Sequence, residues 1–402
     1  MPESNKKYKV LHLARWYPNR YDPMPGLFIQ RHVESTKIYC DASVIYTHMV
    51  EKSADSELVY DLDYQIINEV PTAKVYYRSS QIGLKPLDKL INIHRFFKAN
   101  HVGINQIKKE SGKFDIIHIH ILTRLGVIGL FHKLFYSTPY IITEHWSRYL
   151  NLTGSFTGFF RKFVTRLVVK YASAITAVTN NLADAMRSHR LLNTNYIILP
   201  NVVDSVFLSG SAISDSKSEK TTFLHVSCFE DKSKNISGLL RVISELSKKR
   251  NDFVFRMVGD GMDMDWLRNY SNELGLNEDV IQYTGLLEGK DLVNEMKNSD
   301  ILVIFSNYEN FPVVINESLS LGVPVIATRV GGIPERINHN NGILVDAGKE
   351  TQLLKAFEDF LDNKIYFNME VIQNDAVVEF SPASIGRVLN GIYDKSINQK
   401  SS

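Results

Sequence analysis

The chain has 402 residues, which is too long for one typical hydrophobic core and predicts two or three domains. Its apolar fraction of 44% and charged fraction of 22% are ordinary for a globular protein, and a formal net charge of +2 gives no reason to expect a nucleic-acid partner. The two cysteines, Cys40 and Cys228, are far apart, so neither a disulfide framework nor a Cys/His metal site is indicated.

Strand-like and helix-like segments alternate through the first half of the chain. A strand at residues 9–14, a long loop from Arg15 to Gly26 and a helix at 27–39 come first. Further strands are expected at residues 42–46, 74–77, 115–119, 140–143, 174–178 and 196–199. Such alternation predicts a parallel sheet with right-handed crossovers, and hence a first domain over residues 1–200.

The alternation restarts after a solvated segment at residues 209–220, which is rich in Ser, Gly, Asp and Lys. Strands are expected at residues 222–226, 253–258, 280–283, 301–305 and 325–327. They predict a second doubly wound domain over residues 201–380. Residues 381–402 contain a further helix, which either closes the second domain or crosses back to the first.

Two carboxylates flank one strand-to-helix turn in the second domain. Glu309 lies in the loop after the strand at 301–305, and Glu317 lies on a helix for which Pro312 suits the first position. Ligands of open α/β sheets bind beyond the carboxyl ends of the strands, where helix N-termini offer backbone N–H groups to anions. The turn is therefore a candidate binding site for an anion that also carries hydroxyl groups.

The two glutamates have seven residues between them and precede Ser-Leu-Ser-Leu-Gly-Val-Pro-Val-Ile and Gly-Gly-Ile-Pro-Glu. This pattern resembles the donor-binding segment of retaining glycosyltransferases of family 4 (group 1). The resemblance implies the GT-B fold, in which two doubly wound Rossmann-like α/β domains face a central cleft. It also implies that Glu317 holds the ribose hydroxyls, that Glu309 acts at the transferred sugar, and that Asn310, Phe311 and Pro312 lie close to the donor.

Phosphate groups of a donor need cations, and Lys232 and Lys234 lie in a predicted loop after the strand at 222–226. Lys234 resembles the family lysine that contacts the diphosphate. An arginine usually stands several residues before it, but Ser-Cys-Phe occupies residues 227–229 here. Lys232 could supply the second charge, although a lysine lacks the bidentate fork of arginine.

Two further loops of the second domain resemble family elements. Gly259, in Val-Gly-Asp-Gly after the strand at 253–258, corresponds to an element beside the donor. Leu286 lies where family members hold the nucleobase through backbone atoms. Residues 258–261 lack the third glycine of a dinucleotide fingerprint, which disfavours a nicotinamide enzyme.

The first domain contributes candidates for the sugar and the acceptor. His145 resembles the family histidine near the sugar and the departing phosphate, and Glu144 precedes it at the end of a predicted strand. His120 ends another strand, although a histidine on a buried strand is more often a core residue. In the loop after the first strand, Arg15 is a candidate for the acceptor side, and Gly26 permits close approach of backbone to the donor.

Residues 155–171 carry four basic and no acidic side chains. This composition is typical either of an ordinary core helix with its cations outside or of a helix that lies on an anionic membrane surface. No stretch approaches the roughly 18 apolar residues of a membrane span, and the first apolar run is too short for a signal peptide. We expect a cytoplasmic protein, with peripheral contact to the inner face of the membrane as the second possibility.

The resemblance predicts a retaining hexosyltransferase that uses a UDP- or GDP-linked sugar as co-substrate. The acceptor would be a glycan or a lipid-linked molecule, in the synthesis of cell-surface polysaccharide or glycolipid. No Asp-x-Asp pair stands in a convincing place, so we expect neither a metal ion nor another cofactor. Two alternatives remain, namely a sugar-nucleotide epimerase or phosphorylase on the same scaffold, and a catalytically silent subunit that binds a partner.

Overall fold

The computed structural model describes residues 7–51, 59–122, 124–150, 153–208 and 219–398. The chain divides into two compact units. The first unit comprises residues 1–178, 183–202 and 382–402, and the second comprises residues 179–182 and 203–381. Most of the solvated segment expected at 209–220 lies outside the described residues.

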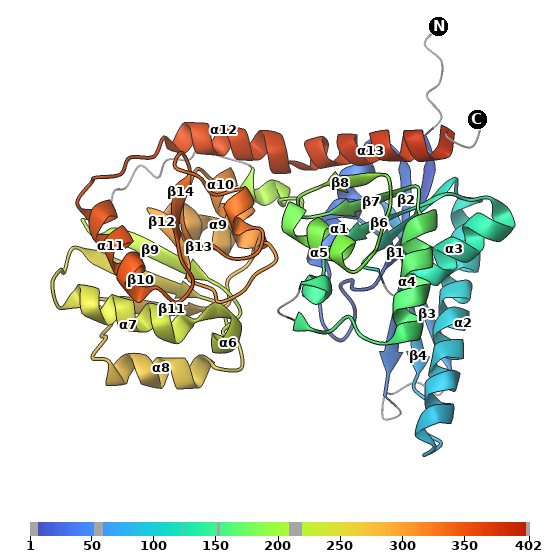
Figure 1. Cartoon of the computed structure of the whole chain (residues 1–402), viewed down its shortest axis with the longest axis horizontal. Helices are drawn as coiled ribbons and strands as arrows, with labels where there is room; N and C mark the ends of the chain where they lie inside the picture. The colour runs from blue at the N-terminus through green and yellow to red at the C-terminus, as the bar shows by residue number, and fades with distance from the viewer. Residues whose placement is uncertain (1–6, 52–58, 123, 151–152, 209–218, 399–402) are drawn as a thin grey trace, which may run out of the picture. The chain divides into compact units, whose positions relative to one another are not determined.

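The first unit is built on an eight-stranded sheet with the order β3-β4-β2-β1-β5-β6-β7-β8 (Figure 1). Its strands are β1 (Lys9–Ala14), β2 (Asp41–Val50), β3 (Tyr60–Ile67), β4 (Val70–Arg78), β5 (Ile116–His120), β6 (Tyr140–Glu144), β7 (Ala174–Ala177) and β8 (Tyr196–Ile198). All neighbours pair in parallel except β3 and β4, which are antiparallel. The prediction of a purely parallel sheet is therefore wrong at this edge. Asn68 and Glu69 both have positive φ, which is typical of a tight two-residue hairpin turn, and so tight a turn reverses the chain direction.

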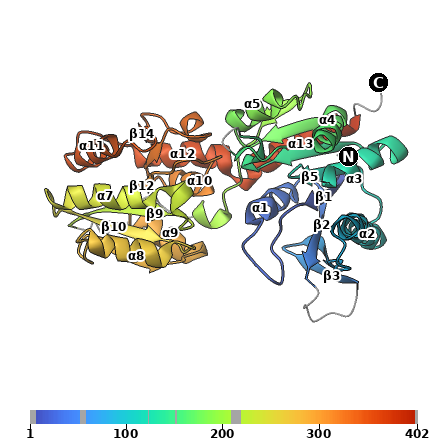
Figure 2. The same ribbon diagram turned by 60° about the horizontal axis from the view of Figure 1, so that its bottom comes forward.

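Helices cover both faces of this sheet. They are α1 (Leu27–Thr36), α2 (Lys85–Ser111), α3 (Leu125–Tyr136), α4 (Phe159–Tyr171), α5 (Asn180–Ser188) and α13 (Pro382–Asn398). Helices α1 and α13 lie on one face, whereas α2 and α3 lie on the other (Figures 1 and 2). No helix among the described residues combines the length and the apolar character that crossing a membrane would require.

The last helix, α13, belongs to the first unit. It buries Ile385, Leu389, Ile392 and Tyr393 in one core with residues of α1 and the sheet. Contact between the two helices reaches the backbone, because a Cβ atom on Gly386 would lie 2.0 Å from the Ser35 carbonyl oxygen of α1. The helix thus completes the core on the α1 face of the sheet.

The second unit contains a six-stranded sheet with the order β11-β10-β9-β12-β13-β14, and every pair in it is parallel. Its strands are β9 (Thr221–Val226), β10 (Phe253–Val258), β11 (Ile281–Gly285), β12 (Ile301–Ile304), β13 (Val325–Thr328) and β14 (Gly342–Val345). Its helices are α6 (Asp231–Lys234), α7 (Ile236–Ser247), α8 (Met264–Glu273), α9 (Gly289–Lys297), α10 (Val313–Ser320), α11 (Glu350–Leu361) and α12 (Met369–Phe380). The segment expected as a loop at 231–234 is instead the short helix α6.

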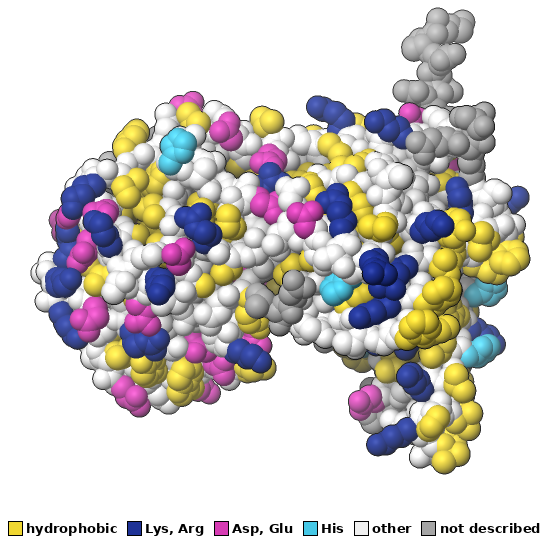
Figure 3. Space-filling model, viewed as in Figure 1, with side chains coloured by type: hydrophobic (Ala, Val, Ile, Leu, Met, Phe, Trp, Pro, Cys, Tyr) yellow, Lys and Arg dark blue, Asp and Glu magenta, His cyan; other side chains and the backbone are white. Residues whose placement is uncertain are grey.

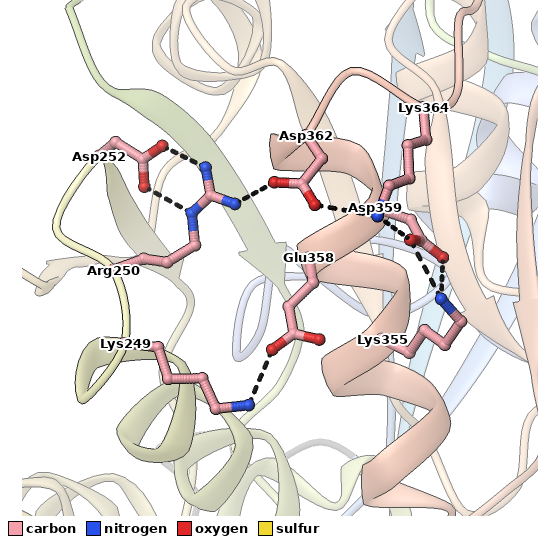
Figure 4. Close-up of polar contacts among 8 residues, drawn as sticks. All are labelled: Lys249, Arg250, Asp252, Lys355, Glu358, Asp359, Asp362 and Lys364. Carbon is pink, nitrogen blue, oxygen red and sulfur yellow. Dashed lines mark hydrogen bonds and ion pairs between the residues drawn. The ribbon is translucent and has the colours of Figure 1, made fainter.

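An ion-pair network joins the segment between α7 and β10 to α11 and the turn after it (Figure 4). Arg250 donates to Asp252 from Nε at 3.0 Å and from Nη2 at 2.7 Å, and it also pairs with Asp362. Lys364 bridges Asp362 and Asp359 at 3.0 and 3.2 Å. Because these groups are partly exposed to water, each pair adds little to stability. The network ties α11 to the segment that leads into β10. That segment lies at the amino ends of the strands, opposite to the edge where their carboxyl ends meet.

Candidate functional site

The loops that follow β9 and β12 are joined at the carboxyl end of the second unit's sheet. The two strands are neighbours in the sheet, so the segments after them leave it side by side. The Asn307 amide donates to the Ser233 carbonyl at 2.8 Å, and the Asn307 side chain donates to the Lys232 carbonyl at 3.1 Å. These bonds fix α6, which carries both candidate lysines, against the loop that carries Glu309.

The centre of this site is an ion pair between Lys234 and Glu309. Lys234 Nζ lies 2.5 Å from Glu309 Oε1, and the side chains are only 17% and 10% exposed. Ser306 Oγ donates to the same carboxylate oxygen at 3.0 Å. The structure therefore brings together two residues predicted for the diphosphate and for the sugar, although they are far apart in sequence.

The backbone of Glu309 is in close contact with the loop after β13. Gly331 has φ +56°, and a Cβ atom there would lie 1.9 Å from the Glu309 carbonyl oxygen. The next residue, Gly332, donates its backbone N–H to the Asn310 carbonyl at 2.7 Å. The Gly-Gly pair is needed here for a positive φ and for close approach of two backbones.

Replacement of Gly331 by Ala is expected to lower both stability and transfer activity, because the new Cβ must displace the Glu309 backbone. Gly348→Ala is the matched control: Gly348 has φ +69°, but a Cβ there meets nothing within 4 Å. The control should lose about 1 kcal/mol through backbone strain alone and keep its activity. Urea unfolding and steady-state kinetics of both variants measure the difference. Equal behaviour of the two variants would mean that the Glu309 contact does not matter.

The loops after β9 and β10 also pack tightly against each other. A Cβ on Gly259, which has φ +136°, would lie 1.9 Å from the Ser227 carbonyl oxygen. The Phe229 amide donates to the Asp260 carbonyl at 2.9 Å, and Phe229 is fully buried. Gly259, predicted beside the donor, thus holds the backbone of 227–229, the segment in which the resemblance would place an arginine. Cys228 in this segment is exposed.

Helix α10 directs its N-terminus toward the carboxyl end of the sheet. Pro312 is its cap residue rather than its first helical residue, and no side chain caps the helix. Glu317 is 7% exposed on this helix, and Phe311 before it is 6% exposed. The uncapped N-terminus carries the positive end of the helix dipole, which favours an anion such as a diphosphate.

The remaining second-unit candidates lie at the surface of the same edge. Lys232 is exposed on the short helix α6, two residues before that helix ends. Leu286 follows β11 and has a 58% exposed side chain. Both positions are accessible to a ligand, and their predicted roles stay predictions.

In the first unit, His145 follows β6 and is 9% exposed. Its Nδ1 lies 3.0 Å from Asn201 Oδ1, so the amide oxygen makes Nδ1 the protonated nitrogen. Burial, reinforced by the nearby His32, lowers the pKa of His145 well below its usual value. The imidazole is therefore neutral at physiological pH, which suits hydrogen bonding to a hydroxyl better than pairing with a phosphate.

His120 belongs to a buried cluster on the α1 face of the sheet. His12 Nδ1 lies 3.0 Å from His120 Nε2, and His118 binds Tyr393 Oη at 2.7 Å and Thr143 Oγ1 at 2.6 Å. The ligand atoms of these three histidines lie within 4.8 Å of one another, as a metal site would require. Both nitrogens of His118 are already hydrogen-bonded, however, so we interpret the cluster as part of the core. His120 is fully buried, which argues against direct contact with an acceptor.

Glu144 is a buried structural carboxylate. It is fully buried, and it accepts from the backbone N–H groups of Leu122 at 2.9 Å, His145 at 3.1 Å and Trp146 at 2.8 Å. Burial raises its pKa to about 7 against the opposing effect of these bonds. The structure assigns it to the turns that follow β5 and β6, and it has no exposed oxygen with which to bind an acceptor.

Sequence reasoning missed an aromatic and cationic group beside His145. The Arg148 guanidinium lies 3.6 Å from the centre of the Trp146 ring, and the Trp146 and Trp16 rings are 5.2 Å apart. Trp16 follows Arg15, whose side chain is exposed. The only signal for this group in the sequence was a tryptophan after each of two strands.

Gly26 lies at the start of α1, in the loop that contains Trp16. It has φ +81°, and a Cβ atom there would lie 2.4 Å from the Trp16 carbonyl carbon and oxygen. The backbone at Gly26 is therefore in close contact with another group, but that group is the Trp16 backbone of the same loop rather than a donor.

The two sheets with their crossover helices and glycine-rich turns are the architecture of GT-B proteins. Solved structures agree: the chain matches the apo form of the lipopolysaccharide outer core galactosyltransferase WaaB (TM-score 0.67, 16% identity, 98% of this chain and 99% of the other). It also matches Anabaena HepE in complex with UDP (TM-score 0.70, 18% identity, 96% and 99%).

Sequence comparison gives the family. Residues 211–376 match the model of glycosyl transferases group 1, and residues 67–207 match that of glycosyltransferase family 4. An uncharacterised glycosyltransferase of Methanocaldococcus jannaschii is 26% identical over 307 residues, which cover 76% of this chain and 81% of the relative. The chain belongs to the group 1, family 4 glycosyltransferases, as the resemblance predicted.

Proposed function

We propose that the protein transfers a sugar from a UDP- or GDP-linked donor to a glycan or lipid-linked acceptor, with retention of configuration and without a metal ion. The largely buried pair of Lys234 and Glu309 at the carboxyl end of a parallel sheet carries this proposal. A cation for a diphosphate and a carboxylate for sugar hydroxyls stand there side by side. The names of the similar structures, a galactosyltransferase and a UDP complex, support a nucleotide sugar and cell-surface glycan synthesis.

The chemistry follows from the charge that the reaction develops. As the bond between the sugar's anomeric carbon and the diphosphate oxygen breaks, negative charge grows on the phosphate and positive charge on the sugar. Lys234 and the N-terminus of α10 stabilise the departing diphosphate, while Glu309 holds the sugar. The acceptor oxygen then bonds to the same face of the anomeric carbon, and its proton passes to the departing phosphate oxygen. His145 remains a candidate contact to the sugar.

Nucleotide binding tests the donor side of the proposal. Thermal unfolding of the wild type and of Glu317→Gln is followed with UDP, GDP, ADP and dTDP, with Glu370→Gln on the exposed start of α12 as control. A nucleotide at a hundred times its Kd adds about 2.7 kcal/mol to the free energy of unfolding. UDP or GDP should raise the Tm of the wild type and the control but not of Glu317→Gln. If no nucleotide raises the Tm, the silent subunit becomes the better reading.

Product analysis separates transfer from the other activities of the scaffold. A transferase releases the nucleoside diphosphate only when an acceptor is present, and NMR of the product reports the anomeric configuration. Retention should give the same configuration as in the donor sugar. An acceptor-independent change of the sugar would instead indicate an epimerase, and inversion would overturn the proposed mechanism.

A further inference from the structure

The surface of α3 and α4 in the first unit exposes an unusual number of aromatic side chains. Their exposed fractions range from 47% for Phe131 to 88% for Phe159. We define the aromatic surface as Phe131, Phe135 and Tyr136 on α3 together with Phe159, Phe160 and Phe163 on α4. Figure 3 shows hydrophobic side chains gathered over this part of the first unit and continuing along α2. Contiguous apolar patches of this kind mark interaction sites.

Helices α3 and α4 are in direct contact. They pack so closely that a Cβ on Gly126 of α3 would lie 2.6 Å from Val168 Cγ1 of α4. The Phe131 and Phe135 rings are 4.7 Å apart. Each helix already has another face in the core, where α3 buries Leu125 and Ile128 and α4 buries Val168 and Val169. The aromatic residues are thus additional to those the fold requires.

The charges on the two helices have a single sign. Neither α3 nor α4 contains an acidic residue. Lys133, Arg161, Lys162 and Lys170 lie on the two helices, and Arg161 and Lys170 are exposed. The expectation of an ordinary core helix with only its cations outside is therefore incomplete, because α4 also directs its phenylalanines outward.

These features select one kind of partner. Two copies of the surface would bring like charges together, which disfavours self-association through it. Amphipathic elements that combine aromatic side chains with Lys and Arg bind anionic lipid surfaces, because the rings enter the interface while the cations remain at the headgroups. We propose that the α3–α4 face docks the protein on an anionic lipid bilayer. The inference stands independently of the donor and of the reaction proposed above.

Vesicle co-sedimentation of the full chain tests this docking. Vesicles of pure phosphatidylcholine are compared with vesicles that also contain phosphatidylglycerol, at low and high salt. The variants are Phe159→Ser with Phe160→Ser, and Arg161→Glu with Lys162→Glu. Tyr366→Ser is the matched control, because Tyr366 is an 87% exposed aromatic residue of the second unit. Thermal unfolding checks that each variant folds, which is expected because the changed phenylalanines are exposed.

The wild type and Tyr366→Ser should bind the anionic vesicles, and added salt should weaken the binding. Each double variant should bind the anionic vesicles at least about tenfold more weakly than the wild type. Two results would overturn the proposal. One is failure of the folded wild type to bind anionic vesicles. The other is a concentration-dependent dimer in analytical ultracentrifugation that the phenylalanine variant abolishes, which would make the surface a contact between two copies.

Discussion

Replacement of Lys234 by Ala should lower kcat/KM for sugar transfer by a factor of about 10² to 10³, the usual loss when one stabilising group is removed from a developing anion. The ammonium group lies in the site with only 17% of the side chain exposed, so water replaces it poorly. The loss should appear in kcat as well as in KM, because the charge on the leaving diphosphate grows in the transition state. Steady-state kinetics with a sugar donor of the nucleotide that stabilises the wild type measures both.

Two further variants make this prediction specific. Lys248→Ala removes an exposed lysine that pairs with Glu245 near the end of α7, and it should retain wild-type kinetics. Lys234→Ala with Glu309→Gln should be more stable than Lys234→Ala alone, because the double change leaves no unpaired, largely buried carboxylate. Wild-type kinetics in Lys234→Ala would show that the lysine does not contact the reacting phosphates.

The free energy of unfolding should fall by several kcal/mol between pH 7 and pH 5. Burial lowers the pKa of His12 to about 3 and that of His32 to about 4, and it lowers the pKa values of His118, His120 and His145 well below the usual range. In the unfolded chain these groups titrate near 6.5. Below that pH only the unfolded state takes up their protons, so stability is lost as the pH falls.

The size of the effect follows from proton linkage. Together, His12 and His32 lower the free energy of unfolding by about 4 kcal/mol between pH 7 and pH 5, and the other three histidines act in the same direction. Glu144 acts in the opposite direction. Its pKa in the folded state is about 7, so the folded state binds this proton before the unfolded state does as the pH falls, which offsets about 2 kcal/mol of the lost stability. A typical domain has a total stability of about 5 to 15 kcal/mol, so the loss is substantial.

Urea unfolding at a series of pH values gives the slope of the free energy of unfolding against pH. This slope reports the number of protons taken up on unfolding. His12→Asn should reduce that slope by about one proton near pH 5.5. His339→Asn, at an exposed histidine outside the cluster, is the matched control. A pH-independent stability from 7 to 5 would mean that the cluster is already protonated, or hydrated, in the folded protein.

The parts of the fold that the sequence predicted well are those where an apolar run ends sharply. Strands β1 and β10 have the predicted bounds, because charged or turn residues flank runs that consist mostly of Val, Leu, Phe and Met. Strand β3 was not predicted, since Tyr60–Ile67 carries two aspartates and lies at the sheet edge, where one strand needs few buried residues. Helix α6 was missed because four residues give no helical period.

The candidate site divides in the same way. Spacing around one turn together with the family resemblance pointed to Glu309 and Glu317, and the resemblance together with the position after a strand pointed to Lys234. The contact between Lys234 and Glu309 depends on β9 and β12 being neighbours, which no local pattern reports. For Glu144, the sequence showed a carboxylate after a strand but not the three backbone N–H groups around it. Side-chain type alone does not distinguish a ligand-binding carboxylate from one that closes a turn.

The position of α13 has a consequence for the order in which the protein is made. The ribosome finishes residues 203–381 before it reaches the helix that completes the first unit. Domains generally fold as units as they emerge, so the second unit is complete while the first still lacks part of its core. Until Tyr393 has been added, His118 has no partner for its Nδ1, and the sheet face that carries the histidines remains uncovered beside α1. Synthesis therefore closes the first unit last, although its strands are made first.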